Sequence, residues 1–291
     1  MKNKSLALKS RTHTKPLWLV SPRLSRRSLI FDQKYLKSAI IASLLKSTLG
    51  FCDGFLPTLV EWQNAAQHAA KSPATWLPLS GALILVATDS DQHISDWGSD
   101  KQPVFGSNKN ANNAADGLTV ALAVTALSSV LLSPQQIPDQ EWVDEKAERI
   151  GLLLLAVGSA GVTAESTKLI TRRERPNDPT GKQDFSFPSG HATESFALAA
   201  ETVRNIDDFS LSEREQTVWR TGIYTMAGSV AWARVEANEH YTTDVLVGAA
   251  LGNFIALTIN NAFIGPAAEN STFLRIMPIQ NGAALEISSS L

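Results

Sequence analysis

The stretch "DVLVGAALGNFIALTINNAFIGPAAE", Asp244 to Glu269, has no charged residue between its two ends. A helix of this length could cross a bilayer, because about 20 apolar residues span the hydrocarbon core. The stretch is rich in Ala, Thr and Asn rather than in Leu and Phe, so a buried helix of a soluble bundle explains it nearly as well. Both interpretations predict a long helix here, and they leave membrane insertion open.

Apolar segments of the same kind recur toward the N-terminus, and a shorter amphipathic pattern covers residues 55–70. The apolar segments lie at residues 73–88, 117–138, 149–167 and 221–233. Short connections between long helices favour antiparallel neighbours. The sequence therefore predicts an all-α protein, built as an antiparallel helical bundle.

The C-terminal tail, "FLRIMPIQNGAALEISSS", has a different pattern. Asn281-Gly282 lies between two apolar-rich runs, which is typical of a two-residue hairpin turn, and Pro278 suits an edge strand. We therefore predict a small C-terminal β-hairpin. The chain then divides into a basic head, a helical domain and a tail, at residues 1–54, 55–266 and 267–291.

The net charge of -2 is unevenly distributed along the 291 residues. Up to Lys37 there are ten Lys or Arg residues and one acid, and the remainder carries 16 basic and 27 acidic residues. An acidic body argues against general nucleic-acid binding. The single cysteine, Cys52, excludes an intramolecular disulfide and a cysteine-based zinc site.

The basic head is followed by the short apolar stretch "SAIIASLLKSTLGF". Basic residues before an apolar run predict a targeting or membrane-orienting segment that stays on the cytoplasmic side. A disordered cytoplasmic tail is the alternative. The mean hydropathy of -0.05 is not typical of a polytopic membrane protein, and it favours a peripheral bundle over an integral one.

Three short motifs carry chemistry, beginning with "KLITRRERP". This motif closes the apolar segment 149–167 with Lys168 and Arg175, and Pro176 is expected to end the helix. The second motif is "FPSGH", in which Pro188 suits the first turn of a new helix. Free N–H groups at a helix N-terminus form a ready anion site.

The third motif is "ARVEANEHYTTD", Ala233 to Asp244. Arg234 ends one helix, and His240 precedes Asp244 by four positions, which puts both side chains on one helical face if the helix includes them. Taken singly, each motif has an ordinary explanation: a solvated helix end, a plain turn or a surface ion pair. In an antiparallel bundle all three lie at the same end, and their cations and histidines suit a phosphate or a similar tetrahedral oxyanion.

Together the motifs resemble the signature of the type 2 phosphatidic acid phosphatase (PAP2) superfamily, which reads K-x6-RP, PSGH and SR-x5-H-x3-D. The superfamily includes lipid phosphatases, bacterial acid phosphatases and vanadium haloperoxidases. The resemblance covers roughly residues 72–264, and it departs from the pattern at Ala233, where the family usually has Ser.

The resemblance implies a metal-independent phosphatase without a cofactor. His240 would attack phosphorus to form a phosphohistidine, Asp244 would hold its tautomer, and His191 would protonate the leaving oxygen and then activate water. The phosphate oxygens would be bound by Lys168, Arg175, Ser189, Gly190 and Arg234.

The expected substrate is a lipid-linked phosphomonoester or pyrophosphate, and the expected protein is a membrane-associated enzyme of the cell envelope whose site faces the periplasm. The alternatives are a soluble periplasmic acid phosphatase, a vanadium-dependent haloperoxidase and a non-enzymatic phospholipid-binding module. We also expect the polar stretch 89–116 to be a loop at the rim of the site, where it would influence which leaving group fits; a mobile solvated loop is the alternative. The oligomeric state stays open.

Overall fold

The computed structural model describes residues 56–136, 141–178, 185–265, 272–279 and 282–289. The described chain is mostly helical, as predicted. Its helices are α2 (Leu59–Lys71), α3 (Pro73–Ala87), α4 (Asp91–Lys101), α5 (Asn108–Leu132), α6 (Trp142–Thr171), α7 (Gly190–Ile206), α8 (Glu213–Glu236) and α9 (Thr242–Phe263).

The beginnings of several helices are fixed by polar caps. Thr58 and Ser212 each form a reciprocal capping box with the glutamate three residues later, at the starts of α2 and α8. The Ser107 and Ser189 side chains accept hydrogen bonds from backbone N–H groups in the first turns of α5 and α7. These caps fix the residues at which α2, α5, α7 and α8 begin.

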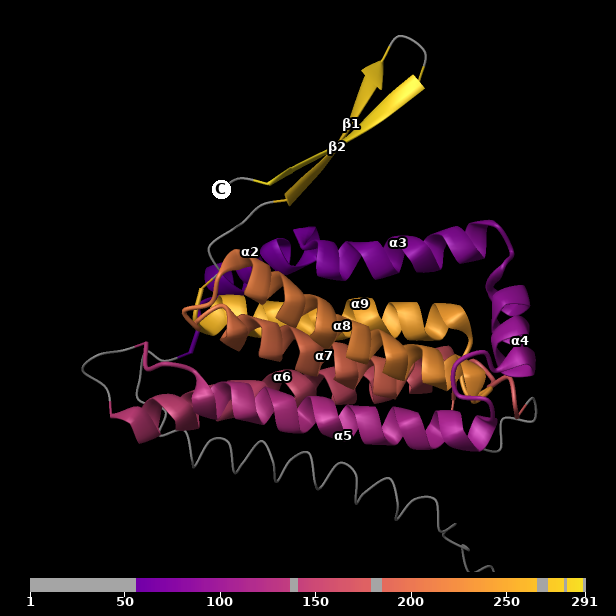
Figure 1. The fold of residues 1–291 in the computed structure, drawn as a ribbon, viewed down its shortest axis with the longest axis horizontal. Helices are drawn as coiled ribbons and strands as arrows, with labels where there is room; N and C mark the ends of the chain where they lie inside the picture. Colours follow the sequence, from indigo (N-terminus) through magenta and orange to yellow (C-terminus); the bar gives the residue numbers. More distant parts are fainter. Residues whose placement is uncertain (1–55, 137–140, 179–184, 266–271, 280–281, 290–291) are drawn as a thin grey trace, which may run out of the picture. The chain divides into compact units, whose positions relative to one another are not determined.

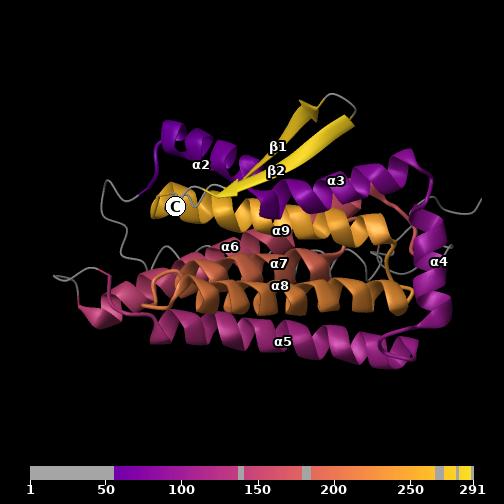
Figure 2. The same ribbon diagram turned by 45° about the horizontal axis from the view of Figure 1, so that its top comes forward.

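Helix α7 lies at the centre of the bundle, in contact with α5, α6, α8 and α9. Helix α9 also packs against α2 and α3, and Figures 1 and 2 both show α3 running alongside it. Helix α4 packs against α8 and α9, and in both views it lies across their ends. The segment before α5 is therefore placed at the end of the bundle where α9 begins.

Small residues allow α7 and α9 to approach closely. A Cβ added at Gly248 would lie 2.8 Å from the Ser189 carbonyl oxygen, and one at Gly252 would lie 2.1 Å from the Thr193 carbonyl oxygen. Alanines dominate the buried cluster between α6, α7 and α9. The Ala- and Gly-rich composition of α9 is thus explained by tight helix packing.

Two expectations about secondary structure were wrong. The stretch 89–116 is not a loop: it contains α4 and the first turns of α5. Helix α6 ends at Thr171 because Arg172 adopts a left-handed conformation with φ of 49°, so Pro176, which comes four residues later, does not set the end.

Three helices, α5, α6 and α9, are long and apolar enough to cross a membrane, and α3 is a shorter apolar helix. Large apolar side chains are exposed on the outer faces of α3, α5 and α6. They include Leu83 and Ile84 on α3, Val120 and Val124 on α5, and Leu154 and Val162 on α6. A surface of this kind is unusual for a protein surrounded only by water.

The tail contains strands β1 (Thr272–Ile279) and β2 (Gly282–Ser289), which pair antiparallel with Ile279 opposite Gly282. Asn281 of the expected turn lies outside the described residues, and the hairpin stays a prediction. The basic head at 1–54 also lies outside them. The proposed division into three parts likewise stays a prediction.

Candidate active site

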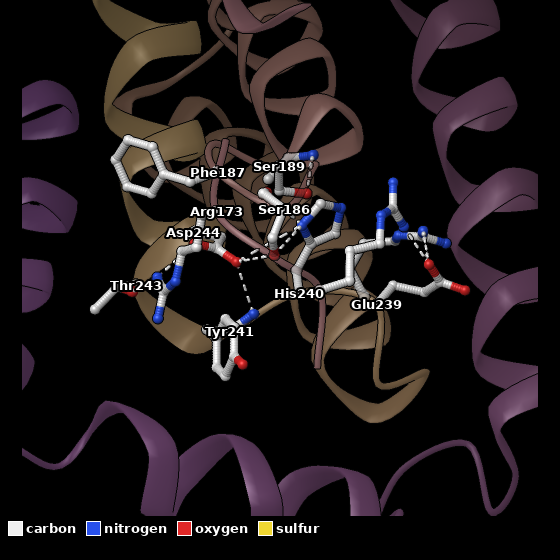
Figure 3. A network of polar contacts seen from close by, with 12 residues as sticks. Arg173, Ser186, Phe187, Ser189, Glu239, His240, Tyr241, Thr243 and Asp244 are labelled. Carbon is white, nitrogen blue, oxygen red and sulfur yellow. Dashed lines mark hydrogen bonds and ion pairs between the residues drawn. The ribbon is translucent and has the colours of Figure 1, made fainter. Parts of the chain in front are cut away.

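The structure brings the three sequence motifs together at one end of the bundle. Lys168 lies in the last turn of α6, Gly190 and His191 begin α7, Arg234 lies in the last turn of α8, and Asp244 lies in the first turn of α9. The antiparallel course of these helices accounts for the convergence. Figure 3 shows the central part of this cluster.

His240 lies in the short connection before α9 and is 2% exposed. Its Nδ1 is 2.7 Å from the backbone carbonyl oxygen of Ser186, and a carbonyl can only accept, so Nδ1 carries the proton. The lone pair is then on Nε2. Burial lowers the pKa of His240 to about 4, against the opposing effect of Asp244, so the ring is neutral near pH 7.

The expected hydrogen bond between His240 and Asp244 is absent. Nδ1 lies 3.8 Å from Asp244 Oδ2, which is an ion-pair distance but too long for a hydrogen bond. The two residues do not share a helical face, because α9 begins at Thr242. The Ser186 carbonyl holds the tautomer directly, and Asp244 acts on the ring through its charge.

The Asp244 carboxylate is fully buried and accepts several hydrogen bonds. Ser186 Oγ and the Tyr241 N–H (2.8 Å) both donate to Oδ2, and Arg173 Nη1 donates to Oδ1 at 2.6 Å. Figure 3 shows Ser186 between Asp244 and the His240 ring. Ser186 therefore connects both residues, through its hydroxyl to one and its carbonyl to the other.

Arg173 is a residue of the site that sequence reasoning missed. Besides Asp244 it contacts Asp91 Oδ2 at 2.8 Å and Thr243 Oγ1 at 2.8 Å, and its guanidinium lies 4.0 Å from the centre of the Tyr241 ring. Burial acts to lower the pKa of Arg173, but the two carboxylates outweigh it and the pKa is raised. The only signal in the sequence was its place in the run "RRER".

His191 faces the site from the first turn of α7. Its Nε2 lies 3.0 Å from Asp116 Oδ1, and its side chain is partly exposed. Burial, and then the nearby positive charge of Arg234, lower the pKa of His191, while Asp116 opposes them. His191 can therefore exchange a proton with a group that enters the site.

Each expected phosphate-binding cation faces an acidic side chain. Lys168 Nζ lies 2.9 Å from Glu165 Oε1, and Glu239 Oε2 pairs with Arg175 Nη1 and lies 3.6 Å from Arg234 Nη2. The positive charge at this end of the bundle is thus locally balanced in the resting structure.

Arg234 is 7% exposed, and burial lowers its pKa. Its Nη1 donates to Asn112 Oδ1, whereas its buried Nε has no hydrogen-bond partner among the described residues. A buried donor without a partner is costly, which makes Nε a natural donor to a ligand oxygen.

Pro188 was expected in the first turn of the "FPSGH" helix, and this was wrong. Pro188 precedes the N-cap Ser189, and α7 begins at Gly190. The Ser189 N–H donates to the Asp244 carbonyl oxygen at 3.1 Å, and a Cβ on Gly190 would lie 3.6 Å from Lys168 Nζ. Gly190 and Lys168 are therefore neighbours, and the first turn of α7 has N–H groups without partners inside the helix.

Ala233, which departs from the family pattern, is fully buried in the core cluster between α5, α7 and α8. It packs against apolar side chains and does not belong to the polar network around His240. Within the described residues, no group of three or more His, Cys, Asp and Glu side chains is arranged to hold a metal ion.

Comparison with known proteins gives one family match. Residues 149–264 match the model of the PAP2 superfamily. Among solved structures, the chain is similar to the crystal structure of a transmembrane PAP2-type phosphatidylglycerolphosphate phosphatase from Bacillus subtilis, with 18% sequence identity and a TM-score of 0.48 over 65% of this chain and 96% of that chain. No curated protein matches the chain.

Proposed function

We propose that the protein hydrolyses a lipid-linked phosphomonoester or pyrophosphate through a phosphohistidine. The premise is that residues 149–264 belong to the PAP2 superfamily and that the protein is a phosphoester hydrolase. The observation that carries the proposal is His240. It is a buried neutral imidazole whose Nδ1 proton is held by the Ser186 carbonyl, which leaves the Nε2 lone pair for attack.

In the first step, His240 Nε2 attacks phosphorus and the bond from phosphorus to the leaving oxygen breaks. His191 gives its proton to that oxygen, and the dianionic substrate favours the protonated imidazole beside it. The His240 ring becomes cationic, and the buried Asp244 carboxylate stabilises this charge. Arg173 and Ser186 keep Asp244 in place.

In the second step, His191 takes a proton from water, and the resulting hydroxide oxygen attacks phosphorus. The bond to Nε2 breaks, phosphate is released, and His240 is again neutral. Lys168, Arg175 and Arg234 stabilise the phosphoryl oxygens in both steps, with the Ser189 and Gly190 region at the start of α7. The unpartnered Arg234 Nε supports this assignment.

A lipid-linked substrate is supported by the apolar outer faces of α3, α5 and α6. If these faces contact acyl chains, the site at the helix ends lies at the level of lipid headgroups.

We propose a membrane-associated enzyme of the cell envelope whose site faces the periplasm. The test is maleimide labelling of Asp100→Cys in intact cells, in a Cys52→Ser background. The cysteine, exposed at the site end, should be labelled, and its protection from the reagent would contradict this orientation.

The test is phosphate release by the purified full chain in detergent, with EDTA present, from lipid phosphomonoesters, prenyl pyrophosphates and soluble phosphomonoesters. We expect turnover that is faster on the lipids. A preference for soluble esters would instead support an acid phosphatase, and halide oxidation with vanadate and peroxide would support a haloperoxidase.

His240→Asn should abolish turnover, and acid-labile, alkali-stable phosphorylation should be trapped only in the wild type. His93→Asn, an exposed histidine of α4, is the matched control and should keep wild-type rates. Undiminished turnover in His240→Asn would overturn the nucleophile assignment.

A further inference from the structure

Glu239 occupies an unusual place, because its carboxylate faces two of the three cations assigned to phosphate. Oε2 is paired with Arg175 Nη1 and lies 3.6 Å from Arg234 Nη2, and the Glu239 side chain is only 18% exposed. Figure 3 shows Glu239 on the opposite side of His240 from Asp244 and Arg173. The carboxylate is therefore directed at the phosphate-binding side of the nucleophile.

The backbone fixes this placement. The N–H groups of Glu239 and His240 both donate to the Arg234 carbonyl oxygen, at 3.1 and 3.3 Å. Asn238 makes the turn possible with a left-handed φ of 60°, a conformation that asparagine tolerates better than most residues. The connection that positions the nucleophile thus also holds Glu239 against Arg234.

Carboxylate and phosphoryl oxygens compete for the same guanidinium donors. A phosphoryl group bound by Arg175 and Arg234 would compete with Glu239 for the N–H of Arg175 Nη1 and for the positive charge of Arg234, whose Nη2 lies 3.6 Å from Oε2. We propose that Glu239 is a built-in competitor for the phosphate subsite, which must swing out when substrate binds and which helps to expel the phosphate product. This inference rests on the proposed function, where the two arginines were assigned to phosphate.

The competition has a measurable consequence. A site that is open only part of the time binds its ligand more weakly. Its apparent Kd is the intrinsic Kd divided by the fraction of time for which the site is open. Removing the charge of Glu239 should therefore strengthen phosphate binding, by about tenfold for one ordinary charged contact. If Glu239 instead serves to hold the arginines in place, removing its charge should weaken phosphate binding.

The experiment measures the inhibition constant of inorganic phosphate at pH 8 against a phosphomonoester substrate, and phosphate binding by calorimetry, on the full chain in detergent. Glu239→Gln should lower the inhibition constant about tenfold. Glu239→Asp, which keeps the charge on a shorter side chain, should fall between Glu239→Gln and the wild type. Thermal unfolding of both variants verifies their fold.

Glu213→Gln is the matched control, because it removes the same charge from an exposed position in the first turn of α8, at the other end of that helix. Its phosphate inhibition should equal that of the wild type. Unchanged or weaker phosphate binding in Glu239→Gln would overturn the inference while wild-type turnover sustains the proposed function. A wild type that neither hydrolyses phosphoesters nor binds phosphate would overturn both.

Discussion

At the scale of single residues, the proposed mechanism depends on the protonation state of one buried histidine. Burial lowers the pKa of His240 to about 4, so the ring is neutral over most of the acidic range, unlike a free histidine with a pKa near 6.5. The unfolded chain binds this proton below about pH 6.5, whereas the folded chain does not until about pH 4. His240 therefore contributes a loss of folding stability as the pH falls through this window.

We predict that the ring signal of His240 in isotope-labelled protein titrates near pH 4 by NMR, with the assignment made by its disappearance in His240→Asn. A midpoint near 6.5 for His240 would contradict the burial argument and would leave the proposed nucleophile largely protonated in mildly acidic solution.

The motif residues were found from sequence because their spacing is fixed along the chain. The same reasoning did not find Arg173, Ser186 and Asp91. Their contacts to Asp244 and Thr243 join segments that lie far apart in the sequence. No spacing rule links such residues. Glu239 was overlooked as well, since an acidic residue beside a histidine has no special meaning until the two arginines are seen around it.

At the scale of elements, apolar periodicity predicted the long helices and failed for α4. The sequence of α4, "DQHISDWGSDK", is mostly polar, and the helix packs through small residues such as Ser95 and Gly98. A Cβ on Gly98 would lie 3.2 Å from Trp232. Packing of this kind leaves no apolar stripe in the sequence, so the element was mistaken for a loop.

We predict that Gly252→Ala destabilises the bundle, because the new methyl group would lie 2.1 Å from the Thr193 carbonyl oxygen in the neighbouring helix. The cost should be about 1–3 kcal/mol, the usual range for overpacking, and should lower the unfolding temperature by several degrees.

Gly222→Ala on α8 is the control, since a Cβ there meets nothing within 4 Å. It should be neutral or stabilising by up to about 1 kcal/mol. Equal unfolding temperatures for the two variants would show that α7 and α9 can separate without cost.

At the scale of the whole molecule, the mean hydropathy and the exposed surface lead to different conclusions about membrane association. The average of -0.05 suggested a peripheral bundle, but it includes the charged head and the polar helix ends. Many of the exposed large apolar side chains lie on α3, α5 and α6 instead. An average over the chain cannot reveal such a distribution, which depends on which helix faces remain uncovered.

We predict that Val120→Lys, near the middle of α5, sharply reduces the amount of protein recovered from the membrane fraction. Val120 is 63% exposed, so a lysine there costs little in water but about 2.5–3.5 kcal/mol in the centre of a bilayer. Val143→Lys, equally exposed but in the first turn of α6, is the control and should be tolerated. If both variants behave like the wild type, the outer face of α5 lies in water.

The contacts of Asp91 have a consequence for where the functional unit begins. Asp91 accepts from Arg173 and from the Thr243 N–H and hydroxyl, across 82 and 152 positions of sequence. Asn112 and Asp116 reach Arg234 and His191 in the same way, from before the start of the family match at residue 149. The polar network around the proposed site therefore extends beyond the family segment into α4 and α5, so a fragment cut to residues 149–264 would lose these contacts.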